Sequence, residues 1–92
     1  MQMSDAFREV LCRKWALDIL QLLNEEGTQN YSGIKDEFDT SSDIIVERLR
    51  QLANAGLINR DKRSARDVRY SITDKGEEVL DLAGDIHRLL DE

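Results

Sequence analysis

The sequence predicts a mainly α-helical domain with one small β-hairpin, an α+β fold. Apolar residues recur at helical spacing in several segments, whereas the segment just before residue 72 alternates as a half-buried strand does. Gly27 and Gly56 stand where two of the helical patterns stop, as expected at left-handed helix ends. The 92 residues fit a single domain, residues 1–92, and so small a core makes self-association a reasonable expectation.

The first predicted helix runs from residue 5 to about residue 26, with Ser4 or Asp5 as its cap. It has too many apolar residues for one stripe and too few for burial on all sides. We therefore expect two buried faces, one of them outside the monomer core. These apolar residues are Phe7, Val10, Leu11, Trp15, Leu17, Ile19, Leu20, Leu22 and Leu23. Residues 28–31 form a short link that can act as a minimal edge strand.

Two more helices follow closely in the chain. Ser32 is expected to cap a short one that ends near Phe38, and residues 38–41 then turn into the next. Two helices joined by a turn of three or four residues have helix-turn-helix spacing.

The third helix is the central element of the prediction. It begins in a cluster of hydroxyl residues at Thr40, which with Asp43 has the spacing of a capping box, and it ends at Gly56. One face is apolar and consists of Ile45, Leu49, Leu52 and Ala53. The opposite face is left free to contact a partner and consists of Ser42, Asp43, Val46, Glu47 and Arg50.

A β-hairpin and a last helix complete the chain. Residues 57–60 and 68–72 are expected to form two strands, and residues 61–67 form an arginine-rich loop that projects between them. Thr73 is expected to cap a helix that runs to about Leu90, with acidic residues in its first turn.

This order of elements is the topology of a winged helix-turn-helix. Four fragments in this order and spacing resemble the HxlR-like branch of the MarR-type winged-helix transcription regulators, over about residues 10–90. The fragments are Lys14-Trp15 with Leu17, Ile19 and Leu20; Glu47-Arg48-Leu49-Arg50-Gln51-Leu52; Ala55-Gly56-Leu57-Ile58-Asn59-Arg60; and Val68-Arg69-Tyr70-Ser71-Ile72-Thr73-Asp74-Lys75-Gly76.

The resemblance implies a homodimer built by residues 5–26 and 74–91. It also implies sequence-specific binding to double-stranded DNA, with the third helix in the major groove and the wing in a minor groove. Three features depart from the family pattern: Arg13 replaces a glycine, the wing lacks a proline, and Cys12 lies close to the Lys-Trp pair. In redox-sensing members of the family the cysteine lies well upstream of that pair.

The charge distribution supports a nucleic-acid partner, although the net charge is −6. Residues 57–70 are the only positive segment, with five basic residues against two acidic ones. A local basic patch on an acidic body can meet phosphate. The excess of aspartate and the scarcity of lysine resemble proteins of salt-loving organisms, but an ordinary acidic cytoplasmic protein fits equally well.

Ten residues are candidates for DNA contact. They are Ser41, Ser42, Asp43, Val46, Glu47 and Arg50 on the third helix and Lys62, Arg63, Arg66 and Arg69 on the wing. Arg50 can read guanine, Glu47 can accept from cytosine, and Val46 can touch a thymine methyl group. The small tip Ser64-Ala65 lets the flanking arginines enter a narrow minor groove. The alternatives are a solvated helix face and a charged, soluble loop; Arg48 can instead tie the third helix to Asp36 or Glu37.

The two terminal helices are expected to form the dimer interface, although the alternative that they only complete the monomer core stays open. The candidate interface residues are Phe7, Val10, Leu11, Val79, Leu82, Ala83, Ile86, Leu89 and Leu90. Trp15 is expected in the core or interface, Cys12 as a small buried apolar residue, and His87 beside the apolar stripe without a metal.

Several function classes are not expected. The sequence shows no nucleophile–base pair, phosphate loop or metal-ligand cluster, so neither an enzyme nor a cofactor or metal site is predicted. No apolar run reaches the roughly 18 residues of a membrane span, which favours a cytoplasmic protein. The expected function is a homodimeric DNA-binding transcription regulator. A winged-helix adaptor that binds only protein is the alternative, and the sequence identifies no small-molecule effector.

Overall fold

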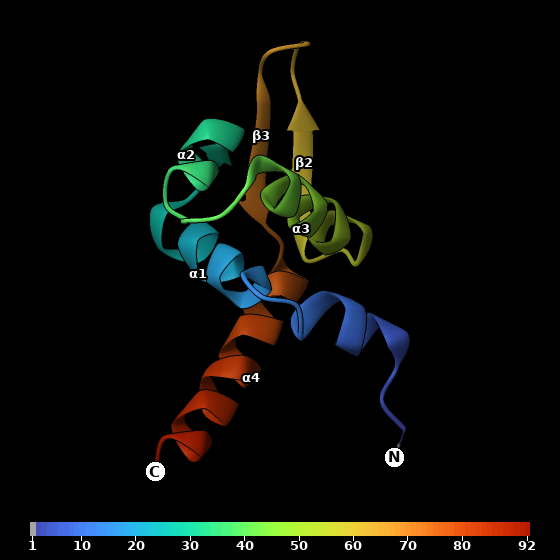
Figure 1. Ribbon diagram of the computed structural model, residues 1–92, viewed down its shortest axis with the longest axis vertical. Coiled ribbons are helices and arrows are strands. Elements are labelled where there is room, and N and C mark those ends of the chain that lie inside the picture. The colour runs from blue at the N-terminus through green and yellow to red at the C-terminus, as the bar shows by residue number, and fades with distance from the viewer. Residues whose placement is uncertain (1) are drawn as a thin grey trace.

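The computed structural model describes residues 2–92 and shows a helical domain with a small antiparallel sheet. The elements are η1 (Phe7–Leu11), α1 (Ala16–Glu26), β1 (Gln29–Asn30), α2 (Tyr31–Lys35), α3 (Ser42–Asn54), β2 (Ile58–Lys62), β3 (Val68–Ile72) and α4 (Asp74–Leu90). The β2–β3 hairpin, which we call the wing together with its loop, projects at one end of the molecule, and α4 and the N-terminal segment diverge at the other (Figure 1). The predicted winged helix-turn-helix fold is confirmed.

The core lies where α1, α2 and α3 meet the base of the wing. α1 contributes Ala16, Ile19, Leu20 and Leu23; α2 contributes Ile34; α3 contributes Ile45, Leu49 and Leu52; the wing and the residue before it contribute Leu57, Ile58 and Tyr70. The strand order is β1-β3-β2, so the short β1 edge strand pairs with β3 as expected from residues 28–31. Because α3 gives its apolar face to this core, its other face is left for solvent or a partner.

The predicted continuous helix over residues 5–26 is wrong. A single π-helical turn, η1, ends at Leu11, and α1 begins only at Ala16. Trp15 between them has φ +78°, a left-handed conformation that costs about 1–2 kcal/mol outside glycine. The Trp15 ring packs on Phe38 at 5.4 Å between centroids, and the ammonium of Lys14 lies 4.8 Å from the same ring. These contacts offset the strain, so tertiary packing rather than a helix-breaking residue sets the break.

Several helix ends also differ from the prediction. Asn30, not Ser32, caps α2, because its side-chain oxygen accepts from the backbone N–H of Gly33 at 2.8 Å. α3 is capped from the predicted hydroxyl cluster by Ser41, whose Oγ accepts from the N–H of Ile44 at 3.4 Å, rather than by a capping box of Thr40 and Asp43. β2 extends past the predicted end at residue 60 to Lys62, so the loop is shorter than predicted and the strands carry more of the wing.

The N-terminus of α4 is fastened to the turn that joins α3 to the wing. The Thr73 side chain caps α4 by accepting from the N–H of Gly76 at 3.0 Å, as predicted, and donates to the carbonyl of Gly56 at 2.7 Å. The Lys75 ammonium donates to the carbonyl of Ala55 at 3.0 Å. Gly56 has φ +77°, as predicted for a left-handed helix end. The end of α3, the wing and α4 therefore form one connected unit.

Candidate nucleic-acid interface

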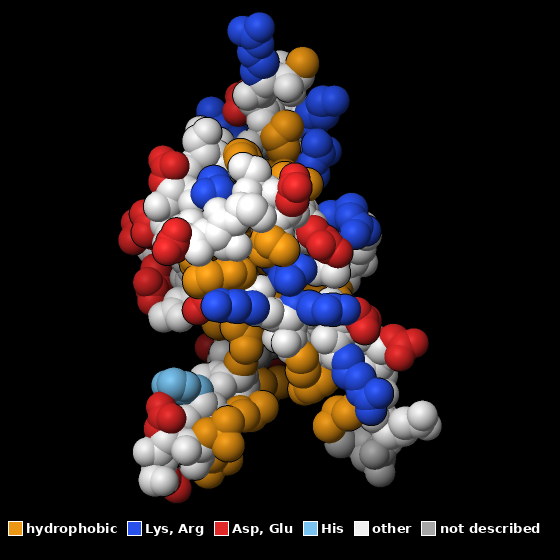
Figure 2. Space-filling view, viewed as in Figure 1, with side chains coloured by type: hydrophobic (Ala, Val, Ile, Leu, Met, Phe, Trp, Pro, Cys, Tyr) orange, Lys and Arg blue, Asp and Glu red, His pale blue; other side chains and the backbone are white. Residues whose placement is uncertain are grey.

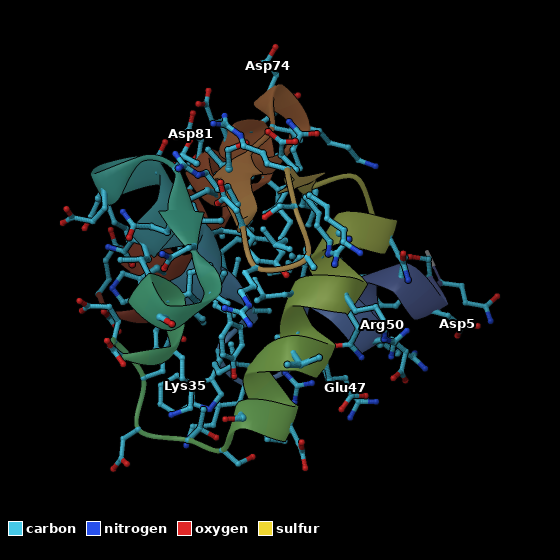
Figure 3. The ribbon with its side chains drawn as sticks, turned by 90° about the horizontal axis from the view of Figure 1, so that it is seen from above. Asp5, Lys35, Glu47, Arg50, Asp74 and Asp81 are labelled. Atoms are coloured by element: carbon cyan, nitrogen blue, oxygen red, sulfur yellow. The ribbon has the colours of Figure 1, made fainter. Side chains whose placement is uncertain are left out.

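The outer face of α3 is available along its whole length. The predicted contact residues Ser41, Ser42, Asp43, Val46, Glu47 and Arg50 are all exposed. Val46 is 53% exposed although it is apolar, so about half of its surface is free to contact a partner. Glu47 and Arg50 lie on the side of α3 away from α2 (Figure 3). This face combines a cap, a carboxylate, an aliphatic group and a guanidinium, which are the groups needed to read base edges.

Contacts with neighbouring elements fix the position of α3. The Tyr31 hydroxyl at the start of α2 donates to the carbonyl of Ser42 in the first turn of α3, at 3.4 Å. The Arg48 Nε donates to the carbonyl of Lys14 at 2.8 Å, and its Nη1 donates to Gln51 at 3.2 Å. Arg48 therefore ties α3 to the break between η1 and α1, and the alternative tie to Asp36 or Glu37 is not observed.

The loop at the tip of the wing is a closed turn. The N–H groups of Arg63 and Ser64 donate to the carbonyl of Asp67 at 2.8 and 3.3 Å. The Ser64 hydroxyl accepts from the N–H groups of Arg66 and Asp67 at 3.3 and 3.1 Å. Because the turn is held by its own hydrogen bonds, it presents the Arg66 side chain from a defined backbone.

The arginines of the wing differ in their surroundings. Arg63 pairs with Asp61 and Arg69 pairs with Asp67, each with 3.1 Å between Nε and a carboxylate oxygen. Among residues 2–92, Lys62 and Arg66 have no such ion-pair partner. The sequence predicted the same role for Arg63 and Arg66, which flank the loop tip, but the structure pairs Arg63 with a carboxylate and, among residues 2–92, leaves Arg66 without one.

The strand register adds a residue that the sequence-based candidate set lacks. In the β2–β3 ladder, Arg60 lies opposite Tyr70 and Lys62 lies opposite Val68, so these side chains share one face of the wing. Tyr70 is buried in the core, so Arg60 and Lys62 extend that face beyond the core. Asp61 lies opposite Arg69 on the other face. The sequence signal for Arg60 was its place in the basic segment, residues 57–70.

Charge is segregated across the molecule. Lys and Arg side chains gather along the wing and beside α3, whereas Asp and Glu side chains gather over the α2 flank (Figure 2). Three acidic residues, Asp36, Glu37 and Asp39, account for part of that flank and are exposed. A DNA duplex that approaches this end of the molecule would be attracted by the cations on the wing and repelled by the acidic residues beside α2. These opposite forces would favour one orientation of the duplex.

The predicted dimer residues fall into two groups. Leu82, Ile86, Leu89 and Leu90 are more than half exposed on the free end of α4. Phe7, Val10, Leu11 and Val79 surround a groove of about 420 Å³ between η1 and α4. Ala83 lines a different groove, of about 600 Å³, to which Asp81 and His87 also belong. The free end of α4 is thus an apolar helix without a partner in the monomer.

Two smaller predictions about side chains were also tested. Cys12 is exposed in the break before α1, so the expectation that it is buried is wrong. His87 is on the surface, with Nε2 3.0 Å from a carboxylate oxygen of Asp91.

A hydrogen bond to Glu9 and the charge of Glu9 raise the pKa of Arg13, and the nearby carboxylate of Glu47 adds to this effect. Within residues 2–92 there is no group of acidic, histidine and cysteine side chains that could hold a metal ion, nor a helix able to cross a membrane.

Comparison with known proteins places this geometry in a family. The model of the HxlR-like helix-turn-helix family matches residues 10–92. The HTH-type transcriptional regulator YvaP of Bacillus subtilis is 36% identical over 84 residues, which cover 87% of this chain and 76% of YvaP. The protein MJ0944 of Methanocaldococcus jannaschii is 31% identical over 75 residues; the match covers 77% of this chain but only 62% of MJ0944.

Solved structures show the same fold. A possible HxlR family transcriptional factor from Thermoplasma volcanium superposes with a TM-score of 0.79 at 26% identity, over 99% of this chain and 84% of that one. A putative MarR family regulator from Porphyromonas gingivalis gives 0.77 at 25% identity, over 100% and 98% of the two chains. These relatives are regulators and not enzymes, as the sequence predicted. The chain belongs to the HxlR-like helix-turn-helix family of transcriptional regulators.

Proposed function

We propose that this regulator binds duplex DNA as a homodimer, with α3 in the major groove and the wing against an adjacent minor groove. The observation that carries the proposal is the placement of an exposed α3 face beside a projecting basic wing, at the opposite end from an apolar helix face that lacks a partner in the monomer. Four large apolar side chains at the end of α4 are exposed in the monomer, and a second copy of the chain can bury them.

The roles on DNA follow from the chemistry of each side chain. Arg50 is placed to donate two hydrogen bonds to guanine, and Val46 is placed to contact a thymine methyl group. The capped N-terminus of α3 at Ser41 carries partial positive charge and can hold a phosphate. Arg66 at the wing tip is the arginine best placed to enter a narrow minor groove, because no carboxylate among residues 2–92 pairs with it.

A protein-binding adaptor remains the second candidate because of a specific observation. Asp43 and Glu47 stand on the exposed face of α3, where DNA phosphates would repel them unless each accepts from a base. In a protein-binding adaptor, the exposed face of α3 with Asp43 and Glu47 would bind a basic peptide. Such an adaptor would not require basic residues on the wing. The positive wing favours the DNA proposal over this one.

The test is selection of bound sequences from a random duplex pool, followed by titration of the enriched duplex. Arg50→Ala is expected to weaken binding about 10- to 100-fold and relax preference at one base position. Arg66→Ala should weaken binding to all duplexes and lower the salt slope by about 1. Arg88→Ala, which removes an equal charge at the far end of α4, is the control. Failure to enrich any sequence, together with no binding at low salt, would refute DNA reading and favour the adaptor.

A further inference from the structure

The wing carries acidic residues in positions where a DNA-binding element gains nothing from them electrostatically. Asp61 and Asp67 each stand two residues before an arginine, on the same face of the wing as that arginine. The resulting pairs, Asp61 with Arg63 and Asp67 with Arg69, are partly exposed to water. Exposed pairs of this kind add little to folding stability, so stability does not explain them.

The carboxylates compete with DNA for the arginines. An arginine in an ion pair must exchange a carboxylate for a phosphate when it binds DNA, whereas an unpaired one gains the phosphate directly. Binding to DNA without regard to sequence depends on the number of phosphates that the protein neutralises. A wing in which Arg63 and Arg69 stay paired therefore neutralises fewer phosphates than its five basic residues would allow.

We propose that Asp61 and Asp67 are affinity-setting residues, which hold Arg63 and Arg69 as internal competitors of DNA phosphate and keep general DNA binding weak. Arg60, Lys62 and Arg66 are then the phosphate contacts of the wing. The base contacts of α3 do not pass through these pairs, so they supply a larger share of the total binding. This inference rests on the proposed DNA-binding function and adds to it the residues that limit non-specific affinity.

The two aspartates can be replaced without loss of the turn. Asp67 holds the loop through its backbone N–H and carbonyl, and only its side chain contacts Arg69. Asp61→Asn and Asp67→Asn keep the shape and remove the charge. The control, Asp85→Asn with Asp91→Asn, makes the same charge change and releases Arg88 and His87 from their pairs. These pairs lie on the free end of α4, at the opposite end of the molecule from the wing.

The experiment measures the dissociation constant of the full chain for a random-sequence duplex, at salt concentrations from about 50 to 200 mM. Asp61→Asn with Asp67→Asn is expected to tighten binding by roughly fivefold for each released arginine. The slope of log affinity against log salt should steepen by about 0.9 for each arginine that gains a phosphate. The control pair should bind as the wild type does.

A double-mutant cycle separates competition from net charge. The gain from Asp61→Asn should shrink to less than half when Arg63 is replaced by alanine, because no arginine is then released. Equal gains in both backgrounds, or an equal gain in the control pair, would overturn the inference and leave the proposed function intact. If neither the wild type nor the double variant binds any duplex at low salt, the proposed function fails and the inference fails with it.

Discussion

Replacing Gly76 by alanine is expected to destabilise the domain, although alanine is the better helix former. Gly76 is buried in the first turn of α4, at the point where that helix meets the base of the wing. A methyl group there would overlap the carbonyl oxygen of Leu57 and lie 2.8 Å from Cγ1 of Ile72. The same Leu57 carbonyl oxygen accepts a hydrogen bond from the N–H of Thr73 at 3.1 Å, so the carbonyl cannot move away without loss of that bond.

The expected cost follows from two opposing terms. Overpacking a core by one methyl group costs about 1–3 kcal/mol, and the upper part of this range applies because the obstacle is backbone. Helix propensity returns at most about 1 kcal/mol. A net loss of about 2 kcal/mol lowers the melting temperature of a domain of this size by about 8–16 °C.

Gly84 in the same helix provides the matched control. Within residues 2–92, a methyl group at Gly84 would have one neighbour within 4 Å, Nη1 of Arg88 at 3.8 Å, which is an ordinary contact with a flexible side chain. Gly84→Ala should therefore stabilise the domain by about 0.4–1 kcal/mol. Thermal and urea unfolding of both variants, at one protein concentration, measure the difference. Equal or same-sign shifts for the two glycines would refute the packing argument.

Three further predictions concern the cap of α2, the hydrogen bond from Arg48 to Lys14, and the apolar face at the end of α4. Asn30→Ala should lower the free energy of unfolding by about 1 kcal/mol, because the N–H of Gly33 loses the side chain that caps α2. Asn24→Ala is the control: it makes the same substitution at an asparagine that caps no helix. Arg48→Met should cost about 1–3 kcal/mol and loosen the segment before α1, seen as faster amide exchange there, because the carbonyl of Lys14 loses its donor. Ile86→Asp should give a monomer in light scattering at micromolar concentration, because the charge cannot be buried in an apolar interface. The monomer should melt at a lower temperature than the dimer. An unchanged dimer would exclude this face of α4 as the interface.

The element order was predictable because local signals and the fold agree. Thr73 before an acidic turn marks the start of α4, and Gly56 marks the end of α3; both signals depend only on nearby backbone geometry. The alternation in residues 68–72 gave β3, because a half-buried strand leaves this pattern in any sequence. The family resemblance, which rested on four such fragments, is confirmed by the match over residues 10–92.

The break before α1 was not predictable in the same way. Residues 12–15 contain neither glycine nor proline, and the apolar pattern runs through them without interruption. The break depends on Trp15 meeting Phe38 and on Arg48 meeting the carbonyl of Lys14, contacts between residues far apart in sequence. The division of the wing arginines into paired and unpaired residues has a similar origin, because it depends on strand register and loop closure rather than on composition.

DNA binding by a chain of net charge −6 depends on how close its acidic groups lie to the duplex. At about 0.15 M salt, charges separated by more than about 8 Å are largely screened. The longest extent of the molecule is 42 Å, and the acidic residues in the C-terminal half of α4 lie at the end opposite the wing, so they oppose DNA weakly. The carboxylates that matter are on α3 and the wing, where they offset most of the cations at contact distance. We therefore expect each protomer to neutralise few phosphates, and since log affinity rises with that number, the proposed homodimer is expected to bind a duplex far more tightly than a single protomer.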